Sequence, residues 1–71
     1  MAESIVKMPM VTVNDPVMGD INVPKYRNPD RIEAFRVVDW DQPDESVVVL
    51  YVRASDAQLT SLAAEPDVEI L

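Results

Sequence analysis

Residues 7–30 read KMPMVTVNDPVMGDINVPKYRNPD, and the assignment of this stretch decides the fold. It holds four prolines, at positions 9, 16, 24 and 29, and its apolar residues occur in short runs without a helical period. Because proline lacks a backbone donor, these prolines exclude a helix and restrict any strand here to a sheet edge. Thirteen of the first 29 residues are apolar and their charges balance, which is unlike a disordered tail. We therefore predict an extended, proline-rich N-terminal arm over residues 1–29 that is ordered where it lies on a surface.

Within this arm, short local signals can be assigned. Val11–Val13 and Ile21–Val23 are expected to be extended fragments. Turns are predicted at Asp15–Pro16, Met18–Asp20 and Asn28–Pro29, because proline, glycine, asparagine and aspartate favour turn geometry.

The remainder, residues 30–71, predicts a compact module. Arg31–Trp40 and Val47–Arg53 are rich in β-branched and aromatic residues and are expected to form an antiparallel hairpin. Asp41–Ser46 (DQPDES) is its polar turn. Both faces of the second strand are apolar, so something besides one short helix must cover the sheet.

A short helix is expected to follow. Ser55 is a good N-cap, and Gln58 stands three residues later, as a capping box requires. Pro66 ends the helix, and Asp67–Leu71 alternates like a short strand, placed parallel to Val47–Arg53 through a right-handed crossover. The predicted fold class is α+β: a β-β-α-β module with a three-stranded sheet and one short helix, preceded by the arm.

The chain contains no cysteine and no histidine. It therefore lacks thiol nucleophiles, imidazole bases and the usual ligands of zinc, iron and copper, and we expect no enzymatic activity, no metal and no cofactor. Asp39, Asp41, Asp44 and Glu45 surround Trp40 (DWDQPDE), but Pro43 and the absence of a central glycine break the spacing of a calcium loop.

The net charge of −7 lies entirely in the second part, since residues 30–71 hold ten acids and three arginines. Without a basic stripe, nucleic acid and anionic membranes are not expected partners. The segment MAESIVKMPMV lacks the features of a signal peptide, and the longest apolar run, VVVLYV, is too short to span a bilayer. We expect a soluble protein that is made in the cytoplasm.

A chain of 71 residues buries a small core, and a partner surface would help to stabilise it. We therefore expect other protein subunits, or a second copy, as partners. The residues assigned to partner binding are the apolar residues of the arm and two aromatic residues that could act as interface anchors. They are Met8, Met10, Val11, Val13, Val17, Met18, Ile21, Val23, Tyr26 and Trp40.

The layout resembles that of small structural proteins of tailed-bacteriophage particles of the capsid-decorating, minor capsid or connector type. The likeness lies in the arm MPMVTVNDPVMGDINVP and in the module that ends SDAQLTSLAAEPDVEIL. It implies a virion protein that stabilises or decorates a multi-subunit particle through arm and sheet contacts.

Three alternatives remain open at this point. Ten acids in 42 residues could mimic DNA phosphates and inhibit a DNA-binding enzyme. The segment LTSLAAEPDVEIL resembles the end of subtilisin-type propeptides, which implies a protease inhibitor. A small regulator that orders on binding is the third.

Overall fold

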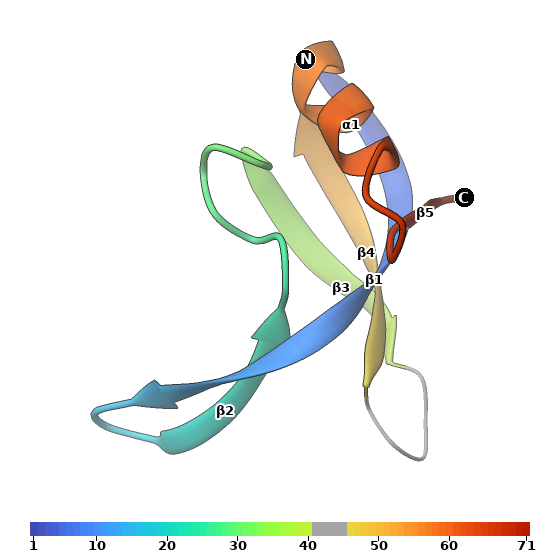
Figure 1. The fold of residues 1–71 in the computed structure, drawn as a ribbon. Coiled ribbons are helices and arrows are strands. Elements are labelled where there is room, and N and C mark those ends of the chain that lie inside the picture. The colour runs from blue at the N-terminus through green and yellow to red at the C-terminus, as the bar shows by residue number, and fades with distance from the viewer. Residues whose placement is uncertain (41–45) are drawn as a thin grey trace.

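The fold is mostly β-sheet in a computed structural model that describes residues 1–40 and 46–71 (Figure 1). The elements in chain order are β1 (Ala2–Asp15), β2 (Gly19–Pro24), β3 (Ala34–Trp40), β4 (Val47–Ala54), α1 (Asp56–Ala63) and β5 (Glu69–Ile70). Four strands form a curled, antiparallel half-barrel sheet in the order β2-β1-β4-β3, and β5 pairs with β1.

The prediction of an N-terminal arm beside a three-stranded sheet is wrong. Residues 2–15 form β1, the longest strand, which lies inside the sheet between β2 and β4. The two fragments predicted around Val11 and Val23 pair with each other as the β1–β2 hairpin. The sequence predicted that this segment covers the second face of the sheet. The segment instead joins the sheet as a strand rather than lying across its face.

Pro9 shows why the proline rule misled. Residues 2–9 of β1 pair with β4, and on the other side of β1 the partners change from β5 at Val6 and Lys7 to β2 from Met10 onward. The Pro9 carbonyl accepts a hydrogen bond from Lys25 N–H at 2.9 Å. Successive residues of a strand direct their backbone groups to opposite sides. An N–H at position 9 would therefore point away from β4, into the gap between β5 and β2. A proline at this position costs one ladder bond and leaves the pairing with β4 intact.

The turn of the β1–β2 hairpin confirms the local turn signals. Asp15 and Gly19 are paired, and residues 16–18 form the turn between them. Asp15 Oδ1 accepts hydrogen bonds from the backbone N–H groups of Val17 and Met18, at 2.8 and 2.9 Å. Gly19 has φ +78°, a left-handed conformation that side chains disfavour. The turn is therefore fixed by a side-chain acceptor on one side and a glycine on the other.

The core lies on one face of the sheet, beneath α1. Its fully buried residues come from β1, β4, α1 and the loop before β3, and they are Val6, Met8, Ile32, Val48, Leu50, Val52, Ala54 and Leu62. The predicted capping box is confirmed, because the Ser55 hydroxyl accepts from Gln58 N–H at 3.1 Å and Gln58 Oε1 accepts from Ser55 N–H at 2.9 Å.

The last strand is present but differs in its partner and direction from the prediction. β5 pairs antiparallel with β1, and Leu71 N–H donates to the Ile5 carbonyl at 2.8 Å. It cannot pair with β4, because β1 and β3 already occupy both sides of that strand. β3 begins later than predicted, at Ala34, and its register with β4 shifts between Val37 and Asp39.

Candidate functional site

The outer part of the β1–β2 hairpin extends away from α1 and from the core (Figure 1). Among residues 1–40 and 46–71, β2 pairs with β1 alone, and Pro24, at its inner end, is its one buried residue. The packing that holds the rest of the sheet therefore does not account for the side chains of this hairpin.

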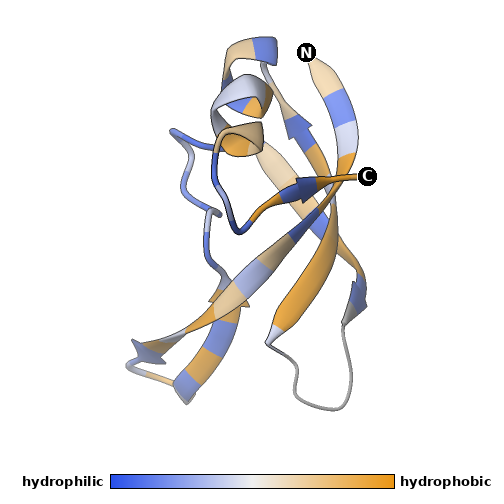
Figure 2. Cartoon of the chain, turned by 45° about the vertical axis from the view of Figure 1, so that its right-hand side comes forward, coloured by the Kyte–Doolittle hydropathy of each residue, from blue (hydrophilic) through white to orange (hydrophobic). Residues whose placement is uncertain are grey.

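The two faces of the hairpin have opposite chemistry. Directly opposed residues share a face, and one face carries the pairs Val11–Val23 and Val13–Ile21, all half-buried. On the other face, Thr12 Oγ1 donates to Asn22 Oδ1 at 2.8 Å and Asn14 Nδ2 donates to Asp20 Oδ1 at 3.1 Å. Figure 2 shows the resulting alternation along β2. The polar face is satisfied by its own hydrogen bonds, whereas the four half-buried side chains of the apolar face lie outside the hydrophobic core.

The tip of the hairpin is also apolar. Val17 is 90% exposed and Met18 is 75% exposed. Their backbone N–H groups bind the Asp15 carboxylate and hold its pKa below the ordinary value, with Met18 N–H the larger cause. We call the tip together with the apolar face the apolar hairpin surface, and its residues are Val11, Val13, Val17, Met18, Ile21 and Val23.

The structure distributes the residues that the sequence assigned to partner binding among several environments. Six of them form the apolar hairpin surface. Met8 is fully buried in the core, and Met10 and Tyr26 are half-buried and pack against it. Trp40 ends β3 opposite Val48, and its side chain lies outside what the structure describes. The acidic turn at 41–45 also lies outside the described residues.

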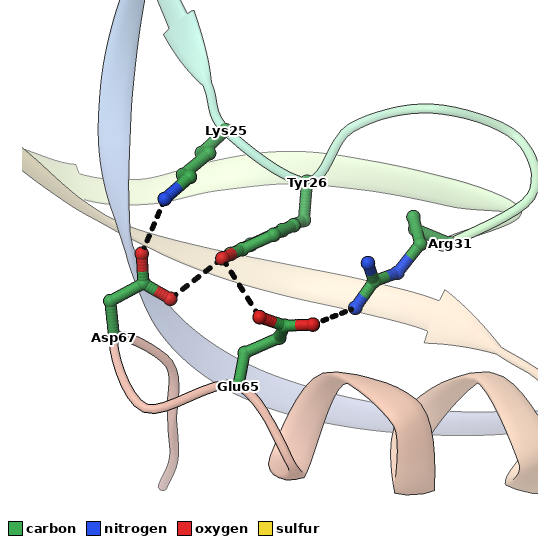
Figure 3. A network of polar contacts seen from close by, with 5 residues as sticks. All are labelled: Lys25, Tyr26, Arg31, Glu65 and Asp67. Carbon is green, nitrogen blue, oxygen red and sulfur yellow. Dashed lines mark hydrogen bonds and ion pairs between the residues drawn. The ribbon is translucent and has the colours of Figure 1, made fainter.

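A polar network that the sequence did not reveal fixes the base of the hairpin (Figure 3). The Tyr26 hydroxyl donates to Asp67 Oδ1 at 2.8 Å and lies 3.2 Å from Glu65 Oε2. Lys25 Nζ pairs with Asp67 at 2.7 Å, and Arg31 pairs with Glu65 at 3.2 Å. These bonds join the segment after β2 to the turn after α1. About 40 residues separate the partners, so no local pattern could have indicated them.

The network also shifts the pKa values of Lys25, Tyr26 and Asp67. The Lys25 ammonium and the Tyr26 hydroxyl lower the pKa of Asp67, in that order of importance. Asp67 in turn raises the pKa of Lys25 and of Tyr26. The guanidinium of Arg31 lies 4.8 Å from the centre of the Tyr26 ring, where a cation is attracted to the aromatic face. All of these shifts favour the charge state that the network needs near neutral pH.

Acids and bases alternate on the outer face of the sheet as well. Arg53 lies 3.7 Å from Glu3, the Tyr51 hydroxyl donates to Glu3, and Arg36 lies over the Tyr51 ring at 5.2 Å. Around these residues the described acids are interleaved with arginines rather than gathered on one continuous anionic face.

The described part of the chain holds neither a cluster of metal ligands nor a helix that could span a membrane. There, no group of three or more histidine, cysteine, aspartate or glutamate side chains is arranged to hold a metal ion. Within the same residues, none of the helical structure is long and apolar enough to cross a membrane.

Comparison with known proteins finds no matching family model, no matching curated protein and no matching solved structure. The apolar hairpin surface is the feature of this chain that bears most directly on its function.

Proposed function

We propose that this chain is a non-enzymatic structural protein that binds neighbouring subunits in a multi-subunit viral particle. The apolar hairpin surface is the observation that carries the proposal. It places two half-buried aliphatic cross-strand pairs and an exposed Val-Met tip on a projecting hairpin, outside the hydrophobic core. The choice of a viral particle rests on the likeness in composition to small phage structural proteins, because the arm that carried the likeness in layout forms β1 and β2 of the sheet.

The hairpin suits docking because it is ordered before it binds. The Asp15 carboxylate and Gly19 fix the turn, and the network around Tyr26 fixes the base. A preorganised surface loses little conformational entropy on association. The sequence predicted that an extended arm would contact the neighbouring subunits. Because residues 2–15 form β1 of the protein's own sheet, we assign these contacts to the hairpin.

The alternative of an acidic DNA mimic is less well supported. A mimic needs carboxylates spaced along one uninterrupted face, and three of the described acids, Asp67, Glu65 and Glu3, instead pair with Lys25, Arg31 and Arg53. Such a mimic would also bind its enzyme with a steep salt dependence, whereas burial of an apolar surface depends weakly on salt.

The proposal is tested by changing the tip without changing the fold. Deletion of residues 1–29 is unsuitable, since it would remove β1 and β2. The double variant Val17→Ser/Met18→Ser loses apolar surface worth about 3 kcal/mol of burial, or roughly a hundredfold in affinity. We expect it to leave the particle fraction when lysates of virus-producing cells are sedimented through sucrose.

The matched control is Thr12→Ser/Asn14→Ser, which alters the polar face of the same hairpin. It should sediment with particles as the unmodified protein does. Equal particle association of both double variants would contradict the proposal, as would the absence of the unmodified protein from the particle fraction.

A further inference from the structure

The outer edge of β2 carries backbone groups that its own sheet does not use. Lys25 N–H donates to the Pro9 carbonyl, so residue 25 directs its backbone groups toward β1. Alternate residues of a strand point the same way, so Ile21 and Val23 also face β1 while Asp20 and Asn22 face outward. Met10 N–H, opposite Pro24, donates away from β2 to Ser46, which agrees with this alternation. Two donors and two acceptors therefore lie on the free edge, on Asp20 and Asn22.

Between Gly19 and Val23 this edge lacks the features by which proteins block strand addition, and Pro24 limits the free edge at the inner end of β2. Bulges, prolines and lysines commonly protect an edge strand. β3, at the opposite edge of the sheet, has such a feature in its register shift between Val37 and Asp39. β2 keeps an unbroken register with β1 from Gly19 to Pro24, and residues 19–23 contain no proline and no lysine.

Charge permits a second copy to approach at this edge. The net charge of −7 opposes self-association over the protein as a whole, but residues 9–24 carry only two charged side chains, those of Asp15 and Asp20. Asp20 is the one ionisable residue of β2. The outer part of the hairpin thus carries two of the thirteen acids of the chain, a small share of its negative charge.

We propose that two copies of this chain pair through their β2 edges, antiparallel, with Ile21 of one copy opposite Ile21 of the other. This inference deepens the proposed function and rests on it, because it names a second copy as one neighbour that the hairpin binds. The two apolar faces then form one surface, with Ile21 and Val23 of both copies at its centre and Val11 and Val13 flanking them.

The chemistry of the edge selects this register. With Ile21 on the two-fold axis, Asp20 of each copy lies opposite Asn22 of the other, and their outward groups form four backbone hydrogen bonds. A shift that centres Asn22 places Asp20 opposite Pro24, which has no N–H and whose carbonyl already accepts from Arg27 at 3.3 Å. A shift that centres Asp20 sets two carboxylates against each other.

The absence of cysteine from the chain makes a direct test possible. Ile21→Cys introduces a single thiol at the axis, where directly opposed Cα atoms lie about 4.5 Å apart and a disulfide can form. Val13→Cys is the matched control on the same face. It lies one strand farther from the axis, so the two copies of residue 13 are separated by three strand spacings, about 14 Å, too far for a disulfide.

The full-length variants are oxidised mildly and separated on a non-reducing gel after circular dichroism has shown that each retains the sheet. We expect Ile21→Cys to form a covalent dimer and Val13→Cys to remain a monomer. Adding Asn22→Pro to Ile21→Cys should abolish the dimer, because it removes an outward N–H without breaking the ladder with β1. Failure of Ile21→Cys to cross-link overturns the inference, and so does equal cross-linking of Val13→Cys, which would indicate that the faces stack instead.

The two proposals fail in different ways. If Ile21→Cys stays monomeric while Val17→Ser/Met18→Ser still leaves the particle fraction, the pairing of two copies through β2 is wrong and the proposed function stands. If Ile21→Cys dimerises while the tip variant stays with particles, pairing stands and the proposed function is wrong.

Discussion

The two methionines at positions 8 and 18 provide a matched test of where the N-terminal segment lies. The same substitution, methionine to alanine, is made at a core position and at the tip of the hairpin. Met8 is fully buried between β1, β4 and α1, whereas Met18 is 75% exposed. A buried Met→Ala change costs about 2–5 kcal/mol through lost burial and the cavity left behind. A chain of this length has a free energy of unfolding of roughly 4–10 kcal/mol, so Met8→Ala should remove a large part of it.

Urea unfolding followed by circular dichroism measures the difference. With a urea m-value of about 1 kcal/mol/M, Met8→Ala should lower the midpoint by roughly 2–5 M, and the upper end of this range leaves the chain partly unfolded in buffer. Met18→Ala should change the free energy of unfolding by less than about 0.5 kcal/mol, as for other surface positions. Nearly equal midpoints for the two variants would refute the placement of β1 in the core.

Three further predictions concern single features of the fold. Ser55→Ala removes the N-cap and should cost about 1 kcal/mol in urea unfolding, whereas Ser61→Ala, on the exposed side of α1, should cost nothing measurable. Gly19→Ala should cost about 1 kcal/mol, because alanine disfavours φ +78° even though the space around this position is open. Lys25 lowers the pKa of Asp67 in the fold, so the contribution of Asp67 is complete above its unfolded pKa and is lost as the pH falls through its folded pKa. Thermal melts should therefore show Asp67→Asn to be less stable than the unmodified protein at neutral pH, with a gap that closes toward about pH 2, and a gap independent of pH would contradict this role.

Local signals predicted the local structure well. The β-branched run at Val47–Arg53 became β4, the capping box at Ser55 began α1, and Asp15–Pro16 began a turn. Each of these features depends on neighbours within about four residues, so the sequence states them directly.

The order of the strands could not be predicted in the same way. A proline can lie inside a sheet where the neighbouring strand on one side is interrupted. Pro9 is such a case, because it lies between the stretch of β1 that pairs with β5 and the stretch that pairs with β2. The sequence alone does not show where such an interruption falls. The direction of β5 depends on β4 already having two neighbours. These are properties of the whole sheet.

The candidate site was predicted in part. The sequence indicated the apolar residues of the hairpin as a surface, because they are too numerous for a solvated tail. It also assigned Met8 to that surface, because an extended arm has no core of its own. In the structure Met8 belongs to a strand, and one face of that strand lies in the core. The bonds from Tyr26 to Glu65 and Asp67 join distant segments and leave no signal in composition or spacing.

The most direct test of the account is residue-resolved amide hydrogen exchange in the isolated chain. Met10 N–H donates to Ser46 at 2.8 Å, and by alternation the N–H groups of Val6 and Met8 also face β4. We predict that these three amides exchange slowly, together with the centre of β4. Exchange of residues 1–15 at the rate of an unstructured chain would contradict the claim that the N-terminal segment is a central strand of the protein's own fold.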